Sequence, residues 1–408
     1  MRWVLWFAVS ACTAAVSLSS LAQSLPAATA SVPTFAQVLD AAWQRSAAGQ
    51  SAQARRNQQR AAQDAAGSLT PAAPSVALSQ RSDRLNRNLG VRETEVELAL
   101  PLWLPGTRAA ALASAGAEGD ATESQLQLSR LKLAGEVREA IWSVRIAHNE
   151  VDASTRRVAE AQALAADVQR RVSAGDLART DANQAQGLVQ LAGASQAEAR
   201  GRLLRAERLY AALSGVAVLP LQDEVPTPAP ALETHPQVVN AERASAAARA
   251  RLEHASRLTR DPPELTLGIR SERATFGESN VTSARIGLRV PFGTDARNQP
   301  RITAASAELV EIEAGARLER DRLQAEIDAA AAELEQARRI ELLAAERARL
   351  AVDTQQLLAK AFRLGEIDLP TRLRTENERF DAELALGRAR LEAGRAISRL
   401  QQAYGLLP

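Results

Sequence analysis

The chain contains few of the residues that build metal sites, catalytic centres or thick hydrophobic cores. Its 408 residues include one cysteine, three histidines and only 3% aromatic residues. His148, His235 and His254 have neither a histidine at i+4 nor a nearby cysteine, which argues against a tight transition-metal site. The sequence also lacks a phosphate-binding glycine loop and a nucleophile elbow. We therefore expect no enzyme activity, no resident metal and no cofactor.

The chain also lacks any local concentration of one charge. Its formal net charge is +2, and it has none of the lysine and arginine blocks that nucleic-acid binding requires. Nucleic acid is thereby excluded as a partner. Ala, Leu, Arg, Glu and Gln dominate instead, and this composition favours long helices that pack closely through small side chains.

Long hydrophobic runs are absent after the first residues. The run Trp3–Leu21 follows a basic residue and precedes Ala22, so residues 1–22 are predicted to be a secretory signal peptide. Cys12 lies in the middle of this run and is expected to be lost with it, with a lipid anchor at Cys12 as the alternative. No later run reaches the roughly 18 apolar residues that a membrane helix requires.

An internal repeat recurs at a fixed offset of 190 positions. Both halves contain a helical seam with 4-3-4-3 spacing, a proline that ends a strand-like run, a glycine turn and a terminal glycine. The matched sets are Leu133, Val137, Ala140, Val144, Ala147 with Leu323, Ile327, Ala330, Leu334, Ala337; Pro101 with Pro291; Gly175-Asp176-Leu177 with Gly365-Glu366-Ile367; and Gly215 with Gly405. Because glycine and proline interrupt regular structure, their shared register is more informative than the helical match alone.

The predicted organisation is two repeats joined by a proline-rich linker. The first repeat, the linker and the second repeat are predicted at residues 23–219, 220–233 and 234–408. Each repeat is predicted to hold a helix, then a β-hairpin, at 74–103 or 263–292, then a long helical hairpin, at 108–214 or 301–404. Thr34–Gln37 and Thr234–Gln237 both match a capping box that opens the first helix of a repeat.

The predicted strands alternate apolar and polar side chains. In the second strand of each hairpin, the face that we expect to contact lipid comprises Val96, Leu98, Leu100, Leu102 and Ile286, Leu288, Val290, Phe292. Each strand has about the 9–11 residues of a tilted membrane strand, although one apolar face is also typical of a soluble sandwich. Four strands cannot close a sheet alone, and a sheet that spans a membrane must have no free edge. We therefore expect several copies to share one barrel with an even number of strands.

The long helix predicted from Arg108 to Val172 would reach roughly 100 Å, which is more than a globular domain buries. Its 4-3-4-3 seam favours coiled-coil packing against the returning helix. A ring of such hairpins would form a hollow tube. A solid antiparallel bundle has the same sequence pattern, so that alternative stays open.

These features together resemble the outer-membrane factor family of efflux systems, whose type member is TolC, and especially the branch typified by the heavy-metal efflux protein CzcC. The resemblance covers essentially the whole mature chain and rests on the duplication, the strand endings, the glycine turns and the closing sequence. These segments are Leu100-Pro101-Leu102, Val290-Pro291-Phe292, Arg171–Leu177, Phe362–Ile367 and Tyr404–Pro408. The resemblance implies a mainly α fold with a small β part. In it, duplicated long antiparallel helical hairpins and two β-hairpins form an α-barrel and a shared transmembrane β-barrel in a trimer.

The resemblance further implies a passive export duct in the outer membrane with a long periplasmic extension. The implied partners are further copies of the chain in a homotrimer, outer-membrane lipid, a periplasmic adaptor protein and an inner-membrane efflux pump that is expected to be proton-driven. Heavy-metal cations are the candidate substrates. The alternative is a periplasmic adaptor or a structural coiled-coil protein of the cell envelope. An adaptor should carry one hairpin flanked by lipoyl-like β modules, whereas the hairpin occurs twice here.

Roles for residues at the helical turns also follow from the resemblance. The adaptor-docking tip would comprise Gly175, Asp176, Leu177, Gly365, Glu366 and Ile367, with the glycines permitting the sharp turns. Asp181 occupies the family's acidic position after the first glycine and is a candidate for the constriction at the tip. Thr371 stands at the equivalent place in the second repeat, so Asp368, with Glu366, is the candidate there.

Overall fold

The computed structural model describes residues 32–292 and 295–408. Met1–Val32 and Pro33–Pro408 form separate units, and the description concerns the second unit. The predicted signal peptide at residues 1–22, together with Cys12, lies outside the described residues.

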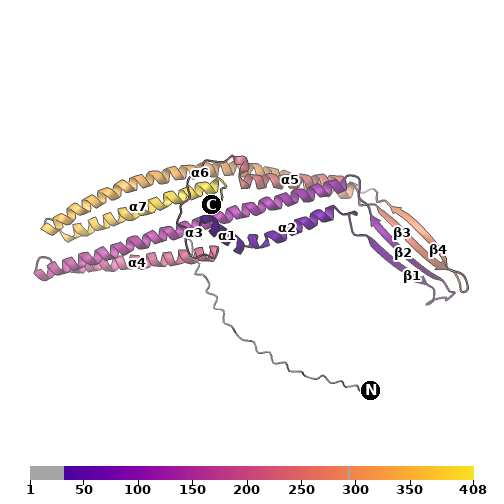
Figure 1. Cartoon of the computed structure of the whole chain (residues 1–408), viewed down its shortest axis with the longest axis horizontal. Helices are drawn as coiled ribbons and strands as arrows, with labels where there is room; N and C mark the ends of the chain where they lie inside the picture. Colours follow the sequence, from indigo (N-terminus) through magenta and orange to yellow (C-terminus); the bar gives the residue numbers. More distant parts are fainter. Residues whose placement is uncertain (1–31, 293–294) are drawn as a thin grey trace, which may run out of the picture. The chain divides into compact units, whose positions relative to one another are not determined.

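Two short helices, α1 (Phe35–Arg45) and α2 (Ala47–Ala66), open the described chain (Figure 1). The capping box predicted at α1 is confirmed. The Gln37 N–H donates to Thr34 Oγ1 at 3.3 Å, and the Thr34 N–H donates to Gln37 Oε1 at 2.9 Å. Ser46 is extended between the helices, and its Oγ accepts from the Gly49 N–H at 3.0 Å, so Ser46 ends α1 and caps α2.

The capping box predicted at Thr234 is wrong. Thr234 closes a short 3₁₀ turn, η1 (Leu232–Thr234), and helix α5 (Pro236–Arg257) begins two residues later. His235 is the N-cap, and its Nδ1 accepts from the Gln237 N–H at 3.1 Å. Pro236 causes the shift because proline suits the first position of a helix, where its missing N–H would have had no helical partner.

Two long helical hairpins make up most of the fold. The first consists of α3 (Thr107–Ala174) and α4 (Arg179–Ser214), and the second consists of α6 (Asp295–Leu364) and α7 (Leu369–Ala403). Helix α3 has 68 residues without a break, which corresponds to roughly 100 Å. The hairpins lie side by side in the order α6, α7, α3, α4 (Figure 1). In the described ranges, no helix combines the length and the apolar character needed to cross a membrane.

Alanine lines the contact within each hairpin. The buried alanines recur every seven residues at Ala185, Ala192, Ala199 of α4 and at Ala382, Ala389, Ala396 of α7. This spacing is that of a coiled-coil seam, and the small side chain lets the two helix backbones approach closely. The seam that the sequence predicted on α3 is buried as well, at Leu133, Val137, Val144 and Ala147.

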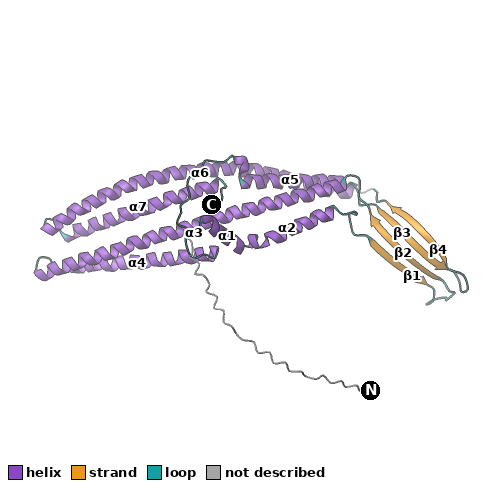
Figure 2. Ribbon diagram, viewed as in Figure 1, coloured by secondary structure: helices purple, strands orange, loops and turns teal. Residues whose placement is uncertain are grey.

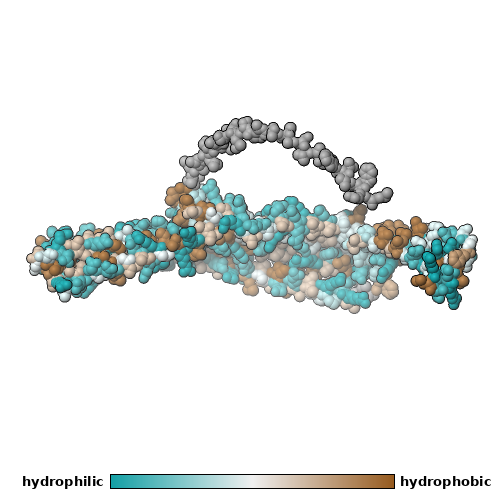
Figure 3. Space-filling model, turned by 90° about the horizontal axis from the view of Figure 1, so that it is seen from below, coloured by the Kyte–Doolittle hydropathy of each residue, from teal (hydrophilic) through white to brown (hydrophobic). Residues whose placement is uncertain are grey.

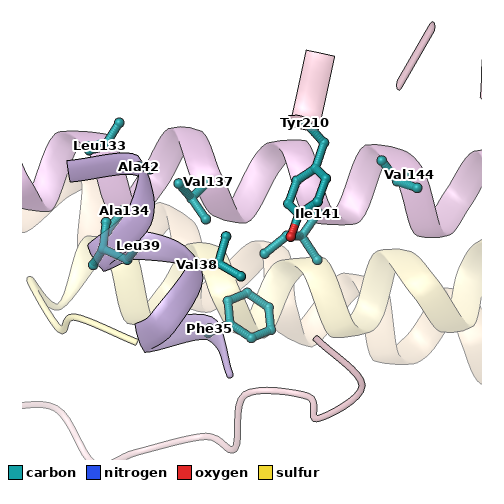
Figure 4. Close-up of a cluster of buried hydrophobic side chains, with 10 residues drawn as sticks. All are labelled: Phe35, Val38, Leu39, Ala42, Leu133, Ala134, Val137, Ile141, Val144 and Tyr210. Carbon is teal, nitrogen blue, oxygen red and sulfur yellow. The ribbon is translucent and has the colours of Figure 1, made fainter. Parts of the chain in front are cut away.

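A buried apolar cluster joins α1 to the first hairpin (Figure 4). Its members are Phe35, Val38, Leu39 and Ala42 of α1, Leu133, Ala134, Val137, Ile141 and Val144 of α3, and Tyr210 of α4. The Tyr210 hydroxyl donates to the Val218 carbonyl at 2.9 Å, which satisfies the polar end of a side chain that is only 2% exposed. The cluster therefore anchors the start of the first repeat to its long hairpin.

A buried ion pair holds the segment between the two repeats. Arg138 of α3 and Glu224 are 2% and 8% exposed, with Arg138 Nη2 2.7 Å from Glu224 Oε1. The same guanidinium donates to Gln402 Oε1 at 2.5 Å and to the Leu406 carbonyl at 2.9 Å. One side chain thus connects α3, the linker and the C-terminal segment.

The four strands form one antiparallel sheet in the order β1-β2-β3-β4 (Figure 2). Their bounds are β1 (Ser75–Ser82), β2 (Arg92–Pro101), β3 (Glu264–Arg273) and β4 (Val281–Arg289). Strands β2 and β3 join the two hairpins, with Val96 opposite Ile269 and Leu100 opposite Leu265. The sheet continues from the ends of α2, α3, α5 and α6, at the far end of the helices from the hairpin turns (Figure 1).

Candidate functional site

One face of the sheet is apolar across all four strands. The register places the apolar residues in rows: Val76, Leu98, Leu267 and Ile286 in one, and Leu100, Leu265 and Leu288 in the next. Several of these side chains have no cover in the described chain, and Val76 is 70% and Ile286 78% exposed. Hydrophobic and hydrophilic residues meet at this end of the chain in the space-filling view (Figure 3). Such a contiguous apolar surface marks a contact with lipid or with another protein.

The opposite face of the sheet is charged and internally paired. Arg270 Nη2 lies 2.8 Å from Glu93 Oε1, and Arg285 Nη1 lies 3.3 Å from Glu95 Oε1. Strand alternation sends these side chains to the face away from Val96 and Ile286. The sheet therefore separates an apolar surface from a hydrated one.

The eight residues predicted to contact lipid do not all lie within strands. Val96, Leu98, Leu100, Ile286 and Leu288 share the apolar face, but Leu102, Val290 and Phe292 follow the ends of β2 and β4. Pro101 and Pro291 explain these ends, because proline donates no hydrogen bond to a sheet ladder. The predicted lipid-contacting set did not include the apolar residues of β1 and β3. The alternation of apolar and polar residues along these two strands would have identified them. Lipid contact itself stays a prediction.

The two outer strands leave one edge each without a partner in the described chain. Strand β1 pairs only with β2, and β4 pairs only with β3, among residues 32–292 and 295–408. An exposed edge presents a row of unpaired N–H and C=O groups that can accept another strand. The sheet is thus open at both sides.

The turns of the two helical hairpins have the same backbone geometry. Gly175 and Gly365 have φ of +90° and +78°, a region that favours glycine. After each glycine an N–H returns to the helix, from Asp176 to the Arg171 carbonyl at 2.9 Å and from Glu366 to the Ala361 carbonyl at 3.0 Å. Asp176 and Glu366 are exposed at the turns.

The prediction treated Leu177 and Ile367 as apolar contacts for an adaptor, but in the structure both side chains pack against the chain itself. Both are half-buried against a cluster of Val168, Ala185, Phe362 and Leu369, which joins the ends of the two hairpins. Their main visible role is to hold the two turns together. Docking of an adaptor by these leucine and isoleucine side chains stays a prediction.

The two aspartates predicted for the constriction cap helices. Asp181 Oδ2 accepts from the Ala178 N–H at 3.1 Å, and Asp368 Oδ1 accepts from the Thr371 N–H at 3.1 Å. The hydrogen bonds from Thr371 hold the pKa of Asp368 below its ordinary value. The acid sits at the third helical position in one repeat and at the N-cap in the other, so the capping role is shared although the sequence positions differ.

A polar cavity of about 510 Å³ lies between the hairpins behind the turns. Arg379 of α7 pairs there with Glu160 of α3, and it also lies 3.3 Å from Glu376. Burial lowers the pKa of Arg372, whose guanidinium is 2.5 Å from Glu376. Sequence reasoning missed this buried network, because Arg and Glu on long helices normally form exposed i,i+4 pairs. Within the described part of the chain, no group of His, Cys, Asp and Glu is suited to hold a metal ion.

An open, two-faced sheet set at the end of paired long helices is the architecture of a TolC-like outer-membrane channel protein. A family model described as "Outer membrane efflux protein" matches residues 71–215, which hold β1, β2, α3 and α4. Over that segment the chain is similar to this outer membrane efflux family.

Individual known proteins show the same similarity. The cobalt-zinc-cadmium resistance protein CzcC of Cupriavidus metallidurans is 29% identical over 231 residues, which are 52% of this chain and 53% of that protein. The match thus spans about half the length of this curated relative. The solved structure of CusC superimposes with a TM-score of 0.77 at 18% identity, covering 92% of this chain and 93% of CusC. A membrane protein of Pseudomonas aeruginosa gives a TM-score of 0.74 at 22% identity, covering 91% and 90% of the two chains.

The solved structures confirm the predicted fold class, which is mainly helical with a four-stranded antiparallel sheet. The matching family model and CzcC agree with the predicted family resemblance. The family whose model matches residues 71–215 is described by an outer-membrane location, and the predicted location of this chain agrees with that description. The description of the matched family names efflux and no catalytic reaction.

Proposed function

We propose that three copies of the chain form a passive efflux channel, in which each copy contributes its four strands to one closed sheet in the outer membrane. The observation that supports this most directly is the sheet with one apolar face and two open edges. In hydrocarbon an unpaired backbone N–H or C=O has no partner, so such a sheet is stable there only when neighbouring copies complete it. Its charged face would then line the water-filled interior.

The helical hairpins would continue this channel into the periplasm. Their length of roughly 100 Å far exceeds a bilayer, and their alanine seams keep each hairpin thin. We propose that the exposed turns, with Asp176 and Glu366 at their ends, dock a periplasmic adaptor that connects to a proton-driven inner-membrane pump. Asp181 and Asp368 remain our candidates for the constriction at this end. We also keep the division into two repeats at residues 220–233 as a proposal.

Heavy-metal cations are our proposed substrate class. Support comes from the likeness to a cobalt-zinc-cadmium resistance protein. The test is metal tolerance: deleting the gene should lower the tolerated concentration of cobalt, zinc or cadmium while leaving tolerance of an organic dye unchanged. Loss of dye tolerance alone would contradict this substrate class but not the channel.

Membrane insertion tests the channel with a matched pair of variants on β4. Ile286→Arg places a charge on the apolar face, whereas Ser283→Arg places the same charge on the opposite face. We expect Ile286→Arg to reduce the heat-modifiable trimer in the outer-membrane fraction, because arginine on the lipid face costs up to about 2–4 kcal/mol. Ser283→Arg should assemble normally. Recovery of the unaltered protein in a detergent-free soluble fraction would favour an adaptor or a structural coiled coil instead.

A further inference from the structure

The apolar face of the sheet changes its chemistry in steps toward the end that lies away from the helices. Its outermost apolar row across the four strands comprises Leu78, Val96, Ile269 and Ala284, and the next row is polar and comprises Gln80, Thr94, Ser271 and Thr282. The row after that holds two arginines, because Arg92 of β2 lies directly opposite Arg273 of β3. Strand alternation keeps all three rows on the same face, and Arg92 follows roughly 13 Å along the strand from Val96.

Neither of these two arginines is neutralised by the chain itself. Within residues 32–292 and 295–408, no carboxylate forms an ion pair with Arg92 or with Arg273. The adjacent Glu93 and Glu272 belong to the opposite, charged face, where Arg270 pairs with both of them, at 2.8 Å and 3.1 Å. Because like charges directly opposite one another destabilise a sheet, the two arginines leave an uncompensated positive charge at this end of the apolar face.

The loops beyond the arginines hold Arg273 in place. Its Nε–H donates to the Gly90 carbonyl at 3.3 Å, and its guanidinium lies 5.7 Å from the centre of the Phe276 ring. The Phe276 N–H donates to the Leu89 carbonyl at 3.0 Å, so the loop after β1 is joined to the loop after β3. Arg273 is thus half-buried and held from two sides, whereas Arg92 is exposed beside it.

We propose that Arg92 and Arg273 bind a phosphate group of an anionic lipid in the outer leaflet of the membrane. The proposal rests on the proposed function, which places the loops after β1 and β3 on the outer side. Arginine suits this ligand because its guanidinium can donate two parallel hydrogen bonds to phosphate oxygens. A lipid matches both parts of the surface, since its acyl chains would cover the apolar rows while its phosphate meets the arginines.

The position of the pair within the sheet favours lipid over a neighbouring copy of the chain. Arg92 and Arg273 lie on β2 and β3, the two inner strands, whereas another copy would join at the outer edges of β1 and β4. The helical end of the same face is different, because its row of Leu100, Leu265 and Leu288 holds apolar side chains only. The arginines therefore distinguish the two ends of the face, as a contact with the headgroups of one leaflet requires.

Native mass spectrometry of the purified full-length trimer tests this site with a defined probe. The probe is lipid A, a bisphosphorylated glycolipid, and the comparison ligand is its enzymatically dephosphorylated form. Arg92→Gln should leave the heat-modifiable trimer unchanged, because the Arg92 side chain has no hydrogen-bond or ion-pair partner in the described part of the chain. Arg81→Gln is the matched control, since Arg81 is an exposed arginine near the same end of the sheet but on the charged face, opposite Glu93.

We expect Arg92→Gln to weaken binding of lipid A about fivefold, and Arg92→Gln combined with Arg273→Gln to weaken it about 25-fold, because each arginine near the surface adds its own attraction for an anionic lipid. Arg81→Gln should bind lipid A as the unaltered protein does, and the dephosphorylated lipid should bind all variants alike.

Two results would overturn the site while leaving the channel intact. One is equal binding of lipid A by Arg92→Gln and Arg81→Gln. The other is complete displacement of lipid A by inorganic phosphate, which would assign the arginines to a free anion and not to a lipid. Absence of any trimer in the outer-membrane fraction of the unaltered protein would instead contradict the proposed function itself.

Discussion

Glu224→Ala probes the buried ion pair that holds the linker between the repeats. Glu224 is 8% exposed and Arg138 is 2% exposed, so the substitution leaves a guanidinium buried beside an empty site. Removing one partner of a buried pair costs about 3–5 kcal/mol because the remaining charge keeps its desolvation penalty. The neighbouring residue provides the control: Asp223 pairs with Arg145 at 2.5 Å but is 71% exposed, so Asp223→Ala should cost at most about 1 kcal/mol.

Thermal unfolding followed by helical circular dichroism, combined with limited proteolysis, measures both expected effects. Glu224→Ala should lower the unfolding temperature and make residues 220–233 readily cleavable, whereas Asp223→Ala should resemble the unaltered protein. The double variant Arg138→Met with Glu224→Leu should recover most of the stability, because it leaves no buried charge unpaired. If Glu224→Ala and Asp223→Ala behave alike, the buried pair does not hold the linker.

Three further perturbations address the turns, a helix cap and the seam between hairpins. Gly365→Pro should abolish export while leaving the trimer band intact, because proline cannot adopt φ of +78°; unchanged export in a tolerance assay would remove the docking role of this turn. Burial lowers the pKa of His235, so the stability that neutral His235 contributes is complete above the ordinary histidine pKa and is lost as pH falls through it toward the lower folded value. Unfolding measured against pH should show this loss, and His235→Asn, a non-titrating cap, should remove it; an identical slope in both proteins would contradict the assignment. Gly394→Ala should destabilise the fold by about 1–3 kcal/mol through its clash with Trp142. Gly201→Ala, whose added Cβ meets nothing within 4 Å, should not, and equal unfolding temperatures for the two variants would refute the steric argument.

The sequence prediction was correct where the structure of a single segment depends only on residues within that segment. The alternation around Val96 and Ile286 depends only on strand geometry, and the structure places both on one face. The glycines at 175 and 365 were recognisable because a positive φ at a helix end has few other solutions. The fixed offset between the halves added a long-range constraint that a single motif could not supply.

The sequence prediction was wrong at one helix start, where neighbouring residues compete, and was silent where distant segments meet. At the start of α5, Pro236 displaces the cap from Thr234 to His235, although the capping-box pattern is intact. Pairing of β2 with β3 depends on how the two repeats fold together, so the strand patterns alone left it open. The half-buried state of Leu177 arises from the facing hairpin, which no pattern near Leu177 reveals.

Hydrogen exchange of the edge strands tests the central claim most directly. In the assembled protein extracted from the outer membrane, copies that complete one closed sheet should protect the amides of β1 and β4 as strongly as those of β2 and β3. Slow exchange in all four strands is the result that we predict. Rapid exchange confined to β1 and β4, with β2 and β3 protected, would mean that the edges are open and that no shared cylinder forms.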